Sequence, residues 1–186
     1  MGSKGALRLE VEATGRMAHS AYPELGESAI LKLLDALGRL RKIRWPRDRT
    51  LGETTCNIGT ITGGRAPNVI PDRASAEVMI RLVGDSTALR KKVAAALGDG
   101  VATRIVLEVP PVRLGTIPGI ETTVVKFTTD IPELTGWGEP FLLGPGSVHV
   151  AHTAEERVAK KDLVEAVDLY QKMVKELQAR CDGNPY

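Results

Sequence analysis

The sequence has few cysteines, few aromatic residues and almost no excess of either charge. Cysteine occurs twice in 186 residues, at Cys56 and Cys181, with a separation that fits no metal-ligand spacing. This usage is typical of a reducing compartment, and we expect a cytoplasmic protein. Aromatic residues make up 4% of the chain and the formal net charge is +2, so the composition gives no indication of a nucleic-acid partner.

Long apolar runs are also missing. No uninterrupted apolar stretch approaches the length needed to cross a bilayer, and the N-terminus has no signal-peptide core, so we expect no membrane partner. The basic residues between 39 and 49 fall at the end of a predicted helix, where the helix dipole favours cations. What remains is the composition of an ordinary globular protein, 42% apolar.

Hydrophobic periodicity predicts an α+β domain over residues 5–112. Period-2 alternation and β-branched runs are typical of strands, and apolar residues at helical spacing are typical of amphipathic helices. The predicted elements are strand 7–13, helix 30–40, strand 54–61, strand 74–82, helix 86–97 and strand 105–109. The order βαββαβ predicts a ferredoxin-like sandwich, with two helices on one face of an antiparallel sheet.

Residues 113–186 have a different character. Short strands are predicted at 122–128 and 141–143, followed by a final helix that begins in a capping box of Asp162 and Glu165. Two short strands and one helix leave both faces of the strands uncovered. We therefore expect an incomplete α/β segment that needs a partner domain.

The three histidines, His19, His149 and His152, all lie beside small or glycine-rich residues. A lone loop histidine is usually a solvated surface residue, but three of three in loops favours function. His149 and His152 together make an incomplete zinc site, because such a centre needs three or four protein donors. The neighbouring Glu155 and Glu156 are interpreted as a dipole-favoured helix start rather than as further ligands.

Other candidates each have a structural and a functional interpretation. Asn68, in a loop with proline at both ends, either caps a turn or presents its amide in a fixed direction. Arg81, on a predicted strand, is either a solvated rim residue or a bidentate clamp for a carboxylate. Gly144 and Gly146 either form a plain turn or let a row of backbone N–H groups approach an anion.

Four segments, taken in order, resemble the family of co-catalytic zinc aminoacylases, acetylornithine deacetylases, succinyl-diaminopimelate desuccinylases and carboxypeptidase G-type enzymes. They are similar to the family's G-x-x-A-H-[SA]-[AS]-x-P…G-x-N-A segment, its x-N-V-I-P segment, its strand-closing arginine and its G-P-G…A-H-T-x-[ND]-E loop. They stand at residues 15–30, 64–71, 81 and 143–156. Ser28 and Ser147 depart from the pattern, where the family often has Asn and Asp respectively.

The resemblance implies a lid domain that forms a homodimer and clamps an N-acyl amino acid or a small peptide. His19 would be catalytic and stabilise the tetrahedral oxyanion in the neighbouring subunit's active site. Asn68 would contact the substrate backbone and Arg81 the substrate α-carboxylate. Gly144 and Gly146 would line the substrate pocket with backbone donors.

The resemblance also implies two zinc ions per active site, with cobalt or manganese as alternatives, and His152 as the last histidine ligand. The family's other metal ligands and its general base precede the lid, and no His-x-Asp pair occurs in this sequence. We therefore expect the N-terminal catalytic half to be missing from this chain, which alone would hold zinc weakly and be inactive. The Gly-Pro-Gly loop favours the acetylornithine or diaminopimelate branch.

A second interpretation stays open: a non-catalytic ferredoxin-like module for dimerisation or small-ligand binding. Fold alone does not decide between the two. The joint presence of His19, Asn68, Arg81 and His152 favours part of an enzyme, because a scaffold has no need of them. The missing metal ligands favour the module for this chain taken alone.

Overall fold

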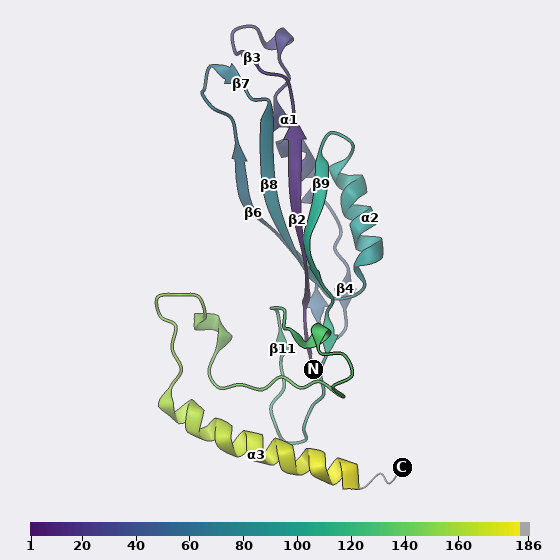
Figure 1. Ribbon diagram of the computed structural model, residues 1–186, viewed down its shortest axis with the longest axis vertical. Helices are drawn as coiled ribbons and strands as arrows, with labels where there is room; N and C mark the ends of the chain where they lie inside the picture. Colours follow the sequence, from purple (N-terminus) through teal and green to yellow (C-terminus); the bar gives the residue numbers. More distant parts are fainter. Residues whose placement is uncertain (183–186) are drawn as a thin grey trace. The chain divides into compact units, whose positions relative to one another are not determined.

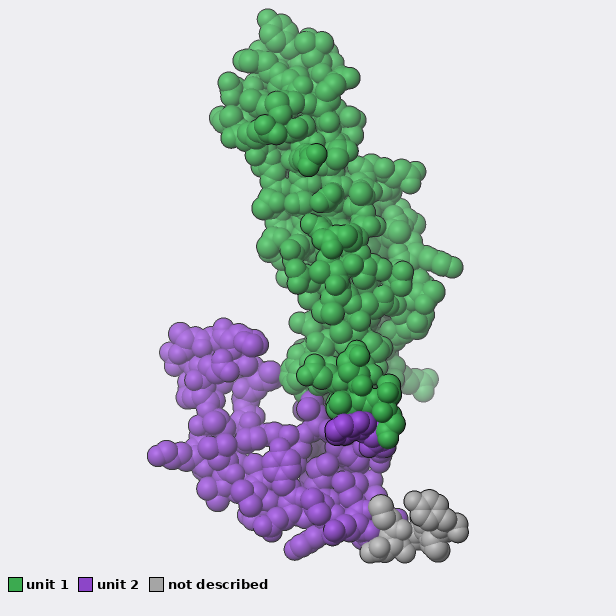
Figure 2. Space-filling model, in the orientation of Figure 1, with its two compact units in different colours: residues 1–113, 124–136 green, residues 114–123, 137–186 purple. Residues whose placement is uncertain are grey.

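The computed structural model describes the backbone of residues 1–182 and the side chains of residues 1–180. The chain forms two compact units, each described by itself (Figure 2). The larger comprises residues 1–113 and 124–136, and the smaller comprises residues 114–123 and 137–186. Among the helices of the described residues, none combines the length and the apolar character needed to cross a membrane.

The larger unit is built on a four-stranded antiparallel sheet of order β6-β8-β2-β9 (Figure 1). In the order of the sequence, helix α1 follows strand β2 and helix α2 follows strand β8. The elements are β2 (Gly5–Thr14), α1 (Ala29–Leu40), β6 (Thr55–Gly63), β8 (Arg73–Leu82), α2 (Ser86–Leu97) and β9 (Ala102–Val109). The predicted ferredoxin-like βαββαβ fold is confirmed.

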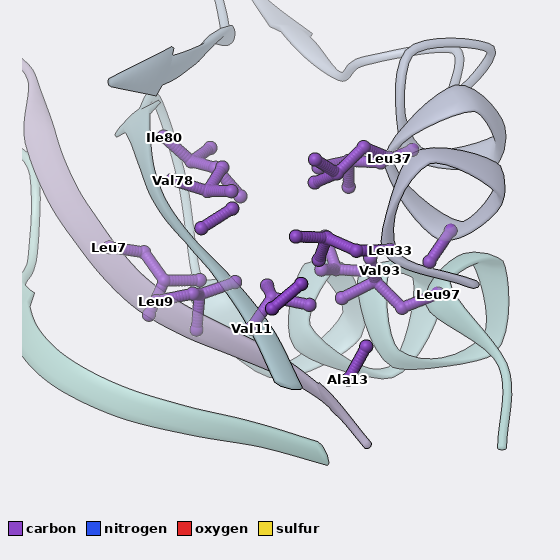
Figure 3. Close-up of a cluster of buried hydrophobic side chains, with 14 of the residues drawn as sticks. Leu7, Leu9, Val11, Ala13, Leu33, Leu37, Val78, Ile80, Val93 and Leu97 are labelled. Atoms are coloured by element: carbon purple, nitrogen blue, oxygen red, sulfur yellow. The ribbon is translucent and has the colours of Figure 1, made fainter. Parts of the chain in front are cut away.

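One face of the sheet and the two helices share a single core (Figure 3). The alternation in β2 and β8 places every second side chain on this face, and the side chains between them on the open face. The core side chains from both strands and both helices include Leu7, Leu9, Val11, Val78, Ile80, Leu33, Leu37, Val93 and Leu97. Full burial of each large apolar side chain contributes about 1.5–3 kcal/mol relative to exposure.

Polar caps fix where the two helices begin. The Ser28 hydroxyl accepts a hydrogen bond from the Leu31 N–H at 3.3 Å, and the Asp85 carboxylate accepts one from the Thr87 N–H at 3.0 Å. Ser is as good an N-cap as the Asn that the family often has at position 28, so this departure is conservative for folding. Gly98, with φ 74°, ends α2 in a conformation that glycine adopts easily.

Short strands complete the larger unit. Strand β1 (Gly2–Ser3) pairs antiparallel with β10 and parallel with β11. These strands are β1 (Gly2–Ser3), β10 (Val112–Arg113) and β11 (Val124–Val125), beside the pair β4 (Arg47–Asp48) and β5 (Gly52–Glu53) and the turn η2 (Ile131–Glu133). The strand predicted at 122–128 is therefore only two residues long, and it belongs to the larger unit rather than to an α/β unit with the last helix.

The smaller unit has one long helix, α3 (Lys160–Asp182), and no strand within its described residues. The strand predicted at 141–143 is wrong: this run packs through the Phe141 ring, which occupies the space where a side chain at Gly115 would stand. An apolar run alone does not make a strand without a neighbour to pair with.

The predicted capping box is wrong as well. Helix α3 begins at Lys160, so Asp162 lies inside its first turn rather than at the N-cap. Near its middle, the Tyr170 hydroxyl donates to the Leu143 carbonyl oxygen at 2.8 Å. Several apolar side chains of α3 are exposed in the structure, among them Leu163, Val164, Val167 and Val174.

Candidate functional site

A small two-stranded ladder stands at one end of the four-stranded sheet (Figure 1). It pairs β3 (Ala18–His19) with β7 (Val69–Ile70), and is followed by the turn η1 (Pro23–Leu25). The Ser20 N–H donates to the Asn68 carbonyl oxygen at 2.9 Å. The structure thus brings together two predicted site residues, His19 and Asn68, from loops that are far apart in the sequence. We call residues 16–27 and 64–72 the tip.

The His19 ring is exposed and held in a defined orientation. Its Nδ1 accepts a hydrogen bond from the Ala21 N–H at 3.1 Å. A ring nitrogen that accepts a hydrogen bond carries no proton, so the neutral ring has its proton on Nε2. The ring edge lies against Tyr22, with 6.3 Å between ring centroids. Nothing among the described residues accepts a hydrogen bond from Nε2–H, so this donor is open to an acceptor outside the tip.

Sequence reasoning did not single out Tyr22. Its ring is exposed and meets the His19 ring at an interplanar angle of 65°, an edge-on arrangement. The only sequence signal is that Tyr22 follows His19 by three residues. This spacing brings the two rings together only if residues 19–22 form a turn. That turn is present, because the Tyr22 N–H donates to the His19 carbonyl oxygen at 2.9 Å.

A groove of about 420 Å³ opens at the same end of the sheet, between the ends of β2, β6 and β8. It is lined by residues 12–14, 62–65 and 72–75. Arg65 pairs with Asp72 at 3.7 Å, while Glu12 and Arg73 take part in none of the ion pairs of the described residues. The groove thus adds both a carboxylate and a guanidinium to the polar surface near the tip.

Arg81 lies at the other end of the sheet. It stands on the open face of β8, half-buried between Ala6 of β2 and Thr55 of β6. It is eight residues beyond Arg73, the first residue of β8, which corresponds to about 27 Å along a strand. A single chain therefore does not bring Arg81 to His19 and Asn68.

The glycine loop lies in the smaller unit. Gly146 has φ 81°, in the left-handed region that favours glycine, and nothing stands within 4 Å of where a Gly144 side chain would begin. The N–H groups of Gly144 and Gly146 have no acceptor among the described residues. The segment does not follow a buried strand as predicted, but its backbone donors are open, as pocket-lining donors need to be.

His152 has the only positive φ of any non-glycine residue in the described part of the chain, 62°. Its backbone N–H donates to the Glu156 carboxylate at 2.8 Å, and this bond holds the left-handed conformation. Strained backbone of this kind is concentrated at functional sites. The interpretation of Glu155-Glu156 as a helix start is wrong, since Glu156 lies before α3 and caps the His152 loop instead.

His149 sits in the turn η3 (Val148–Val150). Its N–H donates to the Ser147 hydroxyl at 3.2 Å, so Ser147 caps this turn. Among the residues whose side chains are described, no group of three or more His, Cys, Asp and Glu is arranged to hold a metal ion. The donors of the described residues therefore do not form a metal centre by themselves.

Comparison with known proteins decides the family. Residues 1–103 match a family model described as the peptidase dimerisation domain of the M20 type. The chain belongs to this M20 dimerisation-domain family. The family is one of hydrolytic peptidases and amidohydrolases, as the resemblance implied.

Two curated fungal relatives match nearly the whole chain. A probable carboxypeptidase of Ajellomyces capsulatus is 39% identical over 93% of the chain and 45% of its own length. A peptidase M20 domain-containing protein of Schizosaccharomyces pombe is 39% identical over 94% of the chain and 44% of its own length. The chain thus spans less than half the length of the curated relatives that it matches.

Solved structures share the fold. The aminopeptidase PepT of Bacillus cereus aligns with a TM-score of 0.71 and 19% identity, covering 95% of this chain and 53% of its own. A tripeptidase of Staphylococcus aureus aligns with a TM-score of 0.63 and 20% identity, covering 94% of this chain and 51% of its own. At this level of identity the likeness establishes the fold and carries no substrate over.

Proposed function

We propose that this chain is the dimerising and substrate-clamping part of a metal-dependent hydrolase that cleaves a C–N amide bond in an N-acyl amino acid or a small peptide. The observation that carries the proposal is the tip, where His19 and Asn68 stand together with a free imidazole N–H. A scaffold that only dimerises has no use for an exposed, oriented donor beside an exposed amide.

The residues have distinct roles in this proposal. The Nε2–H of His19 donates to the oxygen that becomes negative as the amide carbon turns tetrahedral. The Asn68 side chain binds the substrate backbone. The Arg81 guanidinium binds the substrate α-carboxylate in a bidentate pair, and the open N–H groups of Gly144 and Gly146 line the pocket.

The metal would be zinc, with cobalt or manganese as alternatives, and His152 would supply one ligand. Since the described residues form no group of three donors, the other ligands and the general base would come from a segment outside this chain. The chain taken alone is then catalytically inactive. Its relatives' names point to carboxypeptidases, whereas the Gly-Pro-Gly loop favours deacylation of an amino acid, so the substrate panel must include both classes.

The test is reconstitution. The N-terminal half of the Ajellomyces capsulatus relative, supplied as a separate chain with zinc, should restore hydrolysis of an N-acyl amino acid or a dipeptide. Metal content measured by mass spectrometry on this chain alone should stay below one tightly held zinc per chain. A stoichiometric pair of metal ions on the isolated chain would contradict the proposal.

The second candidate is a ligand-binding or dimerisation module without chemistry. This candidate is favoured by the absence, among the described residues, of a group of His, Cys, Asp and Glu that could hold a metal ion. It predicts that no N-terminal half restores hydrolysis, while dimerisation persists. Substrate-like amino acids would still bind. His19→Ala would weaken their binding by the loss of one contact, and there would be no turnover for it to affect.

A further inference from the structure

The charged residues on the open face of the sheet are paired in its middle and unpaired toward its two ends. In β2 and β8 these residues are Arg8, Glu10, Glu12, Arg73, Glu77 and Arg81. The Arg8 guanidinium lies 3.0 Å from the Glu77 carboxylate. The Glu10 carboxylate pairs with Arg104 of β9. The middle of the sheet therefore neutralises its own charges.

Glu12 and Arg73 are the free charges at the end that carries the tip (Figure 1). Both line the groove of about 420 Å³, and neither takes part in an ion pair of the described residues. The other two charged residues of the groove, Arg65 and Asp72, lie 3.7 Å apart and neutralise each other. The groove thus holds one free carboxylate and one free guanidinium, which a single ligand of both charges would satisfy.

The strand register fixes the spacing of these two side chains. Glu12 lies opposite Ser75, and Arg73 lies opposite Thr14, so Glu12 and Arg73 are diagonal neighbours on one face. Diagonal neighbours on antiparallel strands are about 7–8 Å apart. Because side chains stand roughly perpendicular to a sheet, the two charged ends can keep a similar spacing.

A hydroxyl pair adds an uncharged donor to the groove. The Thr62 and Ser75 hydroxyl oxygens are 2.9 Å apart and share one hydrogen bond. Whichever of the two donates, the other keeps its own O–H for a further acceptor. Both residues line the groove, so this donor lies on the same surface as the free carboxylate and guanidinium.

A free α-amino acid fits this spacing. Its ammonium nitrogen and its carboxylate carbon are joined through one carbon atom and lie about 2.5 Å apart. A charge-assisted hydrogen bond at each end adds about 2.8 Å, so the whole bridge spans about 8 Å. A simple anion or a metal ion would leave one of the two protein charges without a partner, and a peptide carries its two terminal charges farther apart.

We propose that the groove binds a free α-amino acid as its zwitterion. The Glu12 carboxylate accepts hydrogen bonds from the ammonium group, and the Arg73 guanidinium donates to the carboxylate. The volume of the groove falls in the range of small-molecule sites, and its hydroxyl groups favour a small or polar side chain on the ligand. Binding needs neither a metal nor the other half of a hydrolase, so the inference does not depend on the proposed function.

The experiment is a titration of the 186-residue chain without metal, followed by amide NMR resonances. Serine should bind with a Kd on the order of 1 mM, because exposed ion pairs contribute little each. The amides of residues 12–14, 62–65 and 72–75 should shift with one common Kd. N-acetylserine, which has no ammonium group, and serinamide, which has no carboxylate, should each bind at least about tenfold more weakly.

Two charge-neutralising variants assign the two ends of the ligand. Glu12→Gln should raise the Kd for serine by about tenfold and leave that for N-acetylserine unchanged. Arg73→Gln should raise the Kd for serine similarly and leave that for serinamide unchanged. The matched controls Glu10→Gln and Arg8→Gln lie on the same face but outside the groove, and should stay within about threefold of wild type.

The comparison of ligands on the wild-type chain decides the question even if a variant fails to fold. Equal affinities for serine, N-acetylserine and serinamide, or the absence of a saturable shift in the groove well above millimolar concentrations, would overturn the inference. So would serine binding that survives Glu12→Gln and Arg73→Gln. Hydrolysis restored by reconstitution of a chain that binds no serine would overturn this inference alone and leave the proposed function standing.

Discussion

The backbone N–H of Ser20 donates to the carbonyl oxygen of Asn68 at 2.9 Å, and this bond fastens the loop of His19 to the loop of Asn68. The two loops are joined again next to the sheet, where one leaves β2 and the other enters β8: the Gly15 N–H donates to the Asp72 carbonyl oxygen at 2.8 Å. The tip is therefore a braced structure in which two polar side chains keep a fixed separation. Such bracing is what a positioned oxyanion donor requires, because a misplaced donor loses most of its effect.

The first prediction concerns His19→Ala in the reconstituted protein. Loss of one oxyanion donor should lower kcat by about 10²–10³ while KM changes little, because the donor acts on charge that develops in the transition state. Steady-state kinetics would show this. Glu24→Ala, an exposed change in the same tip, should leave both constants near wild type. An unchanged kcat in His19→Ala would remove the oxyanion role.

The second prediction concerns Arg81→Lys. Lysine keeps the charge but loses the bidentate fork, so substrates with a free α-carboxylate should lose affinity by about tenfold or more. Their amides, which lack the carboxylate, should bind the variant and the wild type alike. Isothermal titration of both ligand forms makes this comparison. Equal losses for acid and amide would mean that Arg81 supports the fold and does not read the carboxylate.

The sequence predicts the larger unit well because its signals are local. Alternation in β2 and β8 and the stripe in α1 each decide which side chains are buried, and the order of elements then decides the sandwich. The pairing of β1 with β11 could not be predicted this way, since a two-residue strand has no periodicity. The sequence also could not predict that His19 and Arg81 lie toward opposite ends of the sheet, because this depends on which end of β8 the tip joins.

The third prediction concerns the C-terminus of α2. The Arg39 guanidinium of α1 donates to the Ala96 carbonyl oxygen at 2.9 Å and to the Leu97 carbonyl oxygen at 2.6 Å, so it caps carbonyls that the helix leaves open. Arg39→Ala should lower the free energy of unfolding by about 1–2 kcal/mol, as for hydrogen bonds to a charged group. Urea unfolding would measure it. Arg41→Ala, an exposed neighbour, should cost less than about 0.5 kcal/mol.

The fourth prediction is a pH dependence at Cys56. Partial burial raises the pKa of this thiol from 9.0 to about 11, because burial disfavours the thiolate. A raised pKa in the folded state means that its contribution to stability is complete below pH 9 and is lost as pH rises through about 11. In a Cys181→Ser background, iodoacetamide should therefore label the folded chain slowly until the pH nears 11, and the urea-unfolded chain readily from about pH 9. Equal labelling profiles in the two states would contradict the burial of Cys56.

The last prediction separates stability from function at His152. Its φ of 62° costs a side-chain-bearing residue about 1 kcal/mol, so His152→Gly should raise the free energy of unfolding of the chain by a similar amount or leave it unchanged. The same change should abolish hydrolysis in the reconstituted protein, because glycine supplies no ligand. Glu156→Ala should act the other way on the fold and lower stability, since the His152 N–H then loses the carboxylate that accepts its bond at 2.8 Å. Thermal unfolding of both variants and a hydrolysis assay make the test. If His152 were an ordinary turn residue, His152→Gly would lower stability and leave turnover unchanged.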